Sequence, residues 1–216
     1  MKKHFYYLIF VALIALLFAS CSTTIPAISN LSDQTMLLAK NKNIKANYFL
    51  ISDVSDGAIT FVSISKSGNS SSNNSSYKYA SETAFNKIWS SYFQSKFNTY
   101  SKEEIDISVT LVDLYLRQQS VTSAATTFFT GNTKYNIEAV GVFHVLVDYK
   151  GEKFENQFEV TAADYNESQE VRSGDYYYSK NQVNPTQQQA KLLESCFNKG
   201  VIQFENFMQF VLTDEK

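Results

Sequence analysis

The strictest constraint on the fold is an alternating pattern over residues 135–149. One parity of this stretch is apolar throughout and consists of Tyr135, Ile137, Ala139, Gly141, Phe143, Val145, Val147 and Tyr149. Successive side chains of a strand point to opposite faces, so the pattern predicts one long strand with a buried face. Residues 105–117 also alternate, and a change of phase near Leu111-Val112 predicts a β-bulge. After a turn at residues 149–152, a third strand is expected over 154–162.

Two helical patterns can cover such a sheet. Between Ser81 and about Tyr100, large apolar side chains recur three or four residues apart: Phe85, Ile88, Trp89, Tyr92, Phe93 and Phe97. The second helix begins after Asn184, a capping residue followed by Pro185 and by Gln187 of a capping box. Its apolar stripe contains Leu193, Cys196, Phe197, Gly200, Val201, Phe204, Phe207, Met208 and Val211. Both stripes are expected to pack as core.

The remaining segments complete an α+β prediction. Asp56-Gly57 lies between strand-like residues 48–51 and 59–64, which predicts a hairpin. The polar run 67–76 and the segment 165–184, with Tyr176-Tyr177-Tyr178, are expected to be loops. We therefore expect a twisted, mainly antiparallel sheet with two long helices packed on one face and an N-terminal hairpin.

The first 20 residues have the layout of an export signal. A basic start precedes an apolar run, which is shorter than the about 20 residues that span a bilayer. The run ends in Phe18-Ala19-Ser20-Cys21, which resembles the lipobox of bacterial lipoproteins, although such signals usually have Leu in place of Phe18. We expect residues 1–20 to be removed and Cys21 to carry acyl chains that anchor the protein in a membrane. The alternative is an ordinary signal peptide, or an uncleaved anchor, with a chance cysteine.

The remaining chain is long enough for one domain. Removing the 20 signal residues from 216 leaves 196, and we expect a lipidated tether over residues 21–45 and a single domain over 46–216. The signal contains two of the 19 basic residues and none of the 21 acidic ones. The mature chain therefore has 17 basic and 21 acidic residues, and its net charge is near −4. No basic stripe remains for a phosphate backbone, and nucleic acid is not an expected partner. With Cys21 acylated, Cys196 is left without a disulfide partner.

The sequence contains few residues that could perform chemistry. His144 is the one histidine after the signal, and a structural role is expected for it rather than that of a general base. One histidine and one helical cysteine do not supply a zinc site, and every glycine is isolated, so no phosphate-binding loop is expected. The sequence predicts no cofactor, no metal and no enzymatic activity.

The second face of the 135–149 strand is unusually apolar. Val140, Val142 and Leu146 interrupt its polar side chains. Neighbouring apolar side chains on a polar face bury something or bind something. Their expected cover is the N-terminal hairpin, another subunit or a lipid, and they form the candidate interaction face.

The order of elements resembles the YajG-type lipoproteins of Gram-negative envelopes. The resemblance spans about residues 81–212 and rests on the first helix, on residues 106–115, on the strands at 135–147 and 154–165, and on the helix after Pro185. The resemblance implies an envelope lipoprotein with no known reaction. Ser22 resembles the residues that permit sorting to the outer membrane, with the domain on the periplasmic side. We expect a non-enzymatic interaction or assembly module that has an envelope protein or a second copy as partner. The alternative is a carrier with a lipid or other apolar ligand between helices and sheet, and a third possibility is a hydrolase.

Overall fold

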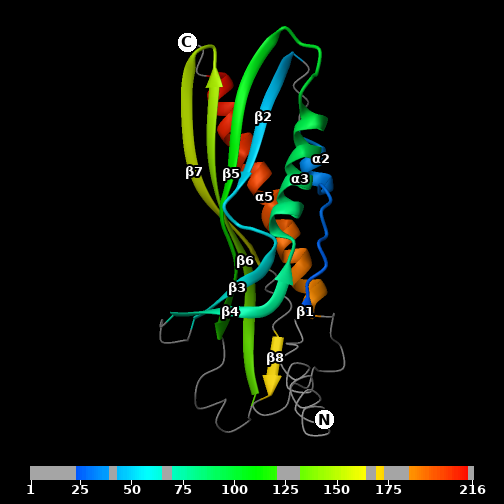
Figure 1. Cartoon of the computed structure of the whole chain (residues 1–216), viewed down its shortest axis with the longest axis vertical. Helices are drawn as coiled ribbons and strands as arrows, with labels where there is room; N and C mark the ends of the chain where they lie inside the picture. The colour runs from blue at the N-terminus through cyan, green and yellow to red at the C-terminus, as the bar shows by residue number, and fades with distance from the viewer. Residues whose placement is uncertain are drawn as a thin grey trace, which may run out of the picture.

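A computed structural model describes residues 23–38, 43–64, 70–120, 132–163, 169–172 and 185–213 (Figure 1). The export signal, Cys21, Tyr176–Tyr178 and the capping residue Asn184 lie outside these ranges. In chain order the elements are β1 (Thr23–Thr24), α2 (Asp33–Met36), β2 (Ile44–Ser52), β3 (Gly57–Ile64), β4 (Ser70–Tyr79), α3 (Ser81–Lys96), β5 (Glu103–Ser120), β6 (Asn132–Tyr149), β7 (Glu152–Ala163), β8 (Gln169–Arg172) and α5 (Pro185–Thr213).

The α+β class is confirmed, with an open sheet of eight strands and helices on one side of it. The main strand order is β1-β4-β3-β5-β6-β7, while β2 pairs with β5 and β8 pairs with β6. Four pairings are antiparallel and three are parallel, so the sheet is mixed rather than mainly antiparallel. The predicted bulge in β5 is present, because the β5–β6 register shifts between Leu111 and Asp113. The turn after β6 places Lys150 and Gly151 at positive φ, as a tight hairpin requires.

The predicted hairpin at Asp56-Gly57 is wrong. β2 and β3 do not pair with each other, and each runs parallel to β5. β2 pairs with residues 103–111 of β5 and β3 with residues 115–119, so the two follow one another along the same edge, on either side of the bulge. The Asp56 carboxylate instead accepts hydrogen bonds from the Thr83 amide at 3.1 Å and the Thr83 hydroxyl at 2.5 Å. Asp56 thus connects the segment between β2 and β3 to the first turn of α3.

The predicted loop over residues 67–76 is wrong from Ser70 onward. β4 pairs antiparallel with β3 along this segment, from Ser70 opposite Ile64 to Tyr79 opposite Gly57. Ladder hydrogen bonds come from the backbone, so a strand can form without apolar side chains when it has a partner. Tyr79, at the end of β4, is buried in the core and supplies the apolar contact that the Ser/Asn run lacks.

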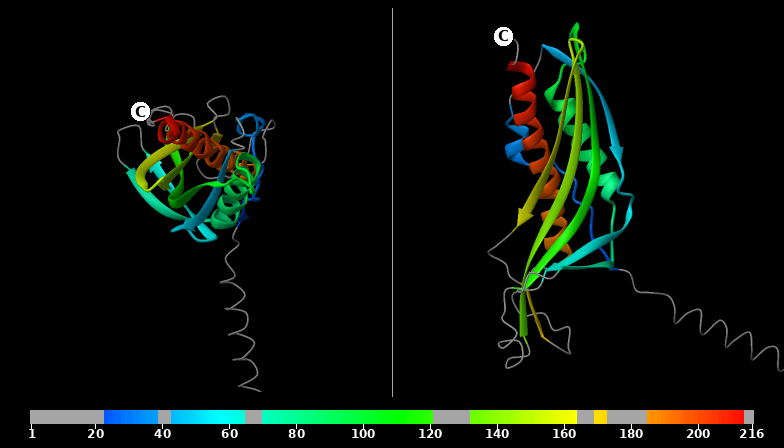
Figure 2. Two further views of the ribbon diagram at one scale, coloured as in Figure 1. Left: turned by 90° about the horizontal axis from the view of Figure 1, so that it is seen from above. Right: turned by 90° about the vertical axis from the view of Figure 1, so that its left-hand side faces the viewer.

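The core lies between the sheet and the two long helices, around which the sheet curves (Figure 2). Phe143 of β6 is fully buried there and meets Phe85 and Trp89 of α3 and Phe197 of α5, with ring centroids 5.7–6.4 Å apart. Two glycines make room for this ring. A Cβ atom at Gly141 would lie 3.0 Å from it, and one at Gly200 only 2.9 Å. The expectation that both apolar stripes form core is confirmed.

The N-terminal segment is not a free tether over residues 23–38. Ile25 is buried, and its amide donates to the carbonyl of Lys78 at 2.8 Å, next to the parallel pairing of β1 with β4. The short helix α2 packs against α3 and α5. The sequence of this segment has no strong periodicity, because a two-residue strand, the buried side chain of Ile25 and one short helix hold it in place. Residues 23–38 contain no long helix or strand with a continuous apolar face. Among the described helices, none is long and apolar enough to cross a bilayer.

Candidate functional site

The three residues of the predicted interaction face differ in exposure. Leu146 is exposed, Val142 is half-buried and Val140 is fully buried, although Val140 is not part of the core under the helices. In the register of the sheet, Val140 lies between Tyr115 of β5 and Thr161 of β7. Of the three covers expected for these residues, the N-terminal hairpin is not present, because β2 and β3 do not pair with each other. Val140 has no exposed surface, so it cannot meet a partner.

Polar groups of the same face surround Val140. Glu138, two residues before it, forms an ion pair with Arg117, whose Nη2 lies 2.6 Å from the carboxylate. Partial burial raises the pKa of Tyr115, and the charge of Glu159 raises it further. The groups next to Val140 on this part of the face are therefore polar or charged.

Farther along the same face, apolar side chains are exposed on three neighbouring strands. They are Phe49 and Ile51 of β2, Val112 of β5 and Leu146 of β6, with exposed fractions of 65%, 49%, 36% and 44%. We call these four residues the outer patch. Val112 belongs to it because the bulge turns both Val112 and Asp113 outward. The sequence prediction missed Phe49 and Ile51 because residues 48–51 were assigned to a hairpin, and the alternation within β2 would have separated its outward from its inward side chains.

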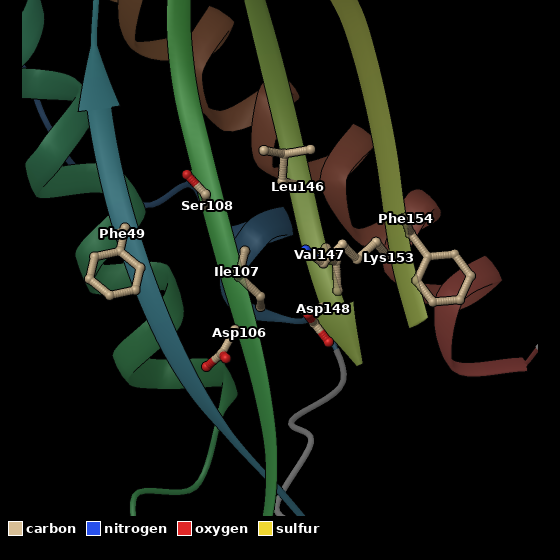
Figure 3. A pocket seen from close by; sticks show the side chains of 9 residues that line it. All are labelled: Phe49, Asp106, Ile107, Ser108, Leu146, Val147, Asp148, Lys153 and Phe154. Atoms are coloured by element: carbon tan, nitrogen blue, oxygen red, sulfur yellow. The ribbon is translucent and has the colours of Figure 1, made fainter. Parts of the chain in front are cut away.

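Between Phe49 and Leu146 the surface is hollowed. Ser108 lies opposite Phe49 on one side and opposite Leu146 on the other, and its small side chain leaves space between the two larger ones. The hollow has a volume of about 260 Å³ and is drawn in Figure 3. Its lining consists of Phe49, Asp106, Ile107, Ser108, Leu146, Val147, Asp148, Lys153 and Phe154.

One end of the hollow is charged. Asp106, Asp148 and Lys153 occupy the next row of the sheet, on β5, β6 and β7. Asn47 of β2 donates to the Asp106 carboxylate at 2.9 Å. The hollow therefore has apolar walls and a polar rim, the combination that protein interfaces use for an anchoring side chain.

Among the described residues, the histidine His144 and the thiol of Cys196 lie on opposite sides of the sheet. The Nε2 atom of His144 lies 2.8 Å from the Glu155 carboxylate, on the outer face. Cys196 is fully buried, and burial raises the pKa of its thiol to about 12, so the reactive thiolate is disfavoured. Within the residues that the structure describes, no group of three or more His, Cys, Asp and Glu side chains could hold a metal ion.

Comparison with known proteins gives likenesses of fold only. No family model matches the chain, and no curated protein matches it. A crystal structure of an uncharacterized protein aligns with 87% of this chain and 99% of its own, at 10% identity and a TM-score of 0.40. Protein XCC0632 from Xanthomonas campestris, of family DUF330, aligns with 84% of this chain and 90% of its own, at 6% identity and a TM-score of 0.44. Similarities this distant carry no inference about function.

Proposed function

We propose that this protein is a lipid-anchored envelope lipoprotein whose domain is a non-enzymatic interaction or assembly module on the periplasmic side of the outer membrane. The anchoring part of the proposal rests on Cys21 and the small residues before it, and on the resemblance to YajG-type lipoproteins. The interaction part rests on one observation. Four apolar side chains of the outer patch are exposed on the sheet face opposite the described helices.

The outer patch has the properties of a contact for another protein. Its members belong to the strands of a rigid sheet, so a partner would meet a surface that is already formed. The hollow beside Ser108 can accept an apolar side chain, and the carboxylates of Asp106 and Asp148 can pair with a basic group beside it. Burial of Phe49 and Leu146 on association would remove their apolar area from water.

The alternative of a carrier places a ligand between helices and sheet. There the described side chains pack closely, and the Phe143 ring lies against the backbone at Gly141 and Gly200. No comparable observation favours a ligand, so the interaction module is preferred.

Replacing Phe49 and Leu146 together by lysine tests the outer patch. Both side chains are exposed on strands, so the double variant should lose less than about 1 kcal/mol of unfolding free energy. In cells it should lose the protein–protein crosslinks that the wild type forms through this face. Tyr100→Lys is the matched control, because Tyr100 is 92% exposed and lies outside the patch. Wild-type crosslinks from a stable double variant would refute the interaction face.

Cys21→Ala tests the anchor. The substitution removes the thiol to which a lipid would be attached, so incorporation of a fatty-acid analogue should fall to background and the protein should remain a larger, uncleaved precursor. Metabolic labelling and gel mobility measure both effects, with Cys196→Ala as the control because that thiol is buried in α5. Equal labelling of the Cys21→Ala variant and the wild type would show that Cys21 is not the anchor.

A further inference from the structure

Residues 23–38 form a continuous segment that is fastened to the domain at both ends, and we call it the N-terminal strap. At its start, β1 pairs with Tyr77 and Lys78 of β4, and Ile25 is buried in the core. Toward its other end, the short helix α2 packs against α3 and α5. These contacts make the strap part of the fold.

Two side chains of α5 hold the middle of the strap. The carboxamide oxygen of Asn198 accepts from the Ser32 amide at 2.8 Å and from the Thr35 hydroxyl at 3.0 Å. Its nitrogen donates to the carbonyl of Asn30 at 3.0 Å, and Glu194 accepts from the Asn30 amide at 3.0 Å. Asn198 and Thr35 are both buried, so the hydrogen bond between their side chains is sheltered from water.

The strap shortens the distance between the domain and the anchor. Cys21 is two residues before Thr23, so their Cα atoms can be at most about 7 Å apart. A flexible tether over residues 23–45 would instead give the domain a root-mean-square reach of about 25 Å. Because β1 is paired to β4, the acyl chains on Cys21 would lie directly beside the sheet.

We propose that the N-terminal strap holds the domain against a lipid surface in one orientation. The side of the domain that carries β1 and the junction of β4 with α3 faces the headgroups, and Gly57 lies there because it pairs with Tyr79 at the end of β4. The start of β6 and the paired strand β8 extend farther in the same direction, while the β6–β7 turn at Lys150-Gly151 lies at the opposite end and points away from the bilayer (Figure 1). This proposal rests on the lipid anchor proposed above. The two ends are well separated, because the 16 residues of α3 that run between them extend about 24 Å.

The orientation can be measured on the full lipidated protein in vesicles of phosphatidylethanolamine and phosphatidylglycerol. A fluorophore is attached at Glu82→Cys, near the start of α3, or at Glu152→Cys, beside the β6–β7 turn; both positions are exposed. The native thiols do not compete for the dye, because Cys21 is acylated and Cys196 is buried. Quenchers on the lipid headgroups should quench the dye at position 82 severalfold more strongly than the dye at position 152.

An insertion separates the strap from the anchor. A flexible insert of 15 Gly and Ser residues between Ser22 and Thr23 leaves the strap docked but frees the domain from the surface, so the difference between positions 82 and 152 should largely disappear. The same insert between Lys150 and Gly151 is the matched control and should preserve the difference in quenching. Equal quenching of both positions in vesicle-bound protein without an insert would overturn the orientation, as would an unchanged difference after the insertion at Ser22. Failure of the lipid anchor itself would appear separately, as protein that carries no acyl chain and does not bind vesicles.

Discussion

Phe143→Ala should lower the free energy of unfolding by about 3–5 kcal/mol, enough to unfold many domains of this size. The ring is fully buried, and both helices pack against it. The backbone at Gly200 lies next to the ring. The cavity left by the alanine could therefore be filled only by a movement of the whole helix α5. Urea unfolding of a chain that begins at Ser22, followed by circular dichroism, measures the loss.

Leu146→Ala is the control for this result. Leu146 is on the same strand, three residues further along and on the opposite face, and 44% of it is exposed. Its truncation should lower the unfolding free energy by less than about 1 kcal/mol. Equal losses from the two substitutions would mean that the two faces of β6 have been exchanged.

Glu205→Ala should lower the free energy of unfolding by about as much as Phe143→Ala, but for an electrostatic reason. Glu205 of α5 is buried, and its carboxylate accepts hydrogen bonds from the Tyr92 hydroxyl and from Lys96 Nζ, the latter at 2.7 Å. Burial raises the pKa of Tyr92 well above its usual value and the charge of Glu205 adds to this, so the phenol remains a donor. Removing Glu205 leaves the Lys96 ammonium largely buried without its counter-ion, which costs about 3–5 kcal/mol.

A double substitution distinguishes the loss of a charge from the loss of packing. Lys96→Met combined with Glu205→Met removes both charges and keeps apolar volume, so most of the stability should return. Urea unfolding of the single and double variants gives the coupling energy directly. A double variant as unstable as Glu205→Ala would show that packing around Glu205, and not the buried charge of Lys96, dominates.

The elements that were predicted correctly from the sequence each have their pattern within one continuous stretch of residues. The aromatic stripe of α3 and the alternation in β6 are each visible in one continuous stretch, and so is the phase change at the β5 bulge. A buried face imposes its period on the residues that form it, so these predictions depend on no distant partner. The same logic identified Phe143 as a core residue.

The parts that could not be predicted depend on distant contacts. Asp56-Gly57 has the composition of a hairpin turn, yet β5 offers an edge long enough for β2 and β3 in succession. The Ser/Asn run becomes a strand because β3 supplies hydrogen-bonding partners. Of the predicted interaction face, only Leu146 belongs to the outer patch, because the alternation within one strand does not reveal which neighbours cover Val140.

The N-terminal strap also determines when this chain can finish folding. Its partners Glu194 and Asn198 are separated from Asn30 and Ser32 by 164 and 166 positions, and Lys45 of β2 bonds to Glu104 of β5 across 59. Contacts between residues so far apart in sequence form slowly, since the intervening chain must first be brought together. A chain that emerges from a membrane with its N-terminus first would therefore expose its early strands until β5 has followed. Only the arrival of the last helix would add the hydrogen bonds that hold Asn30 and Ser32 of the strap.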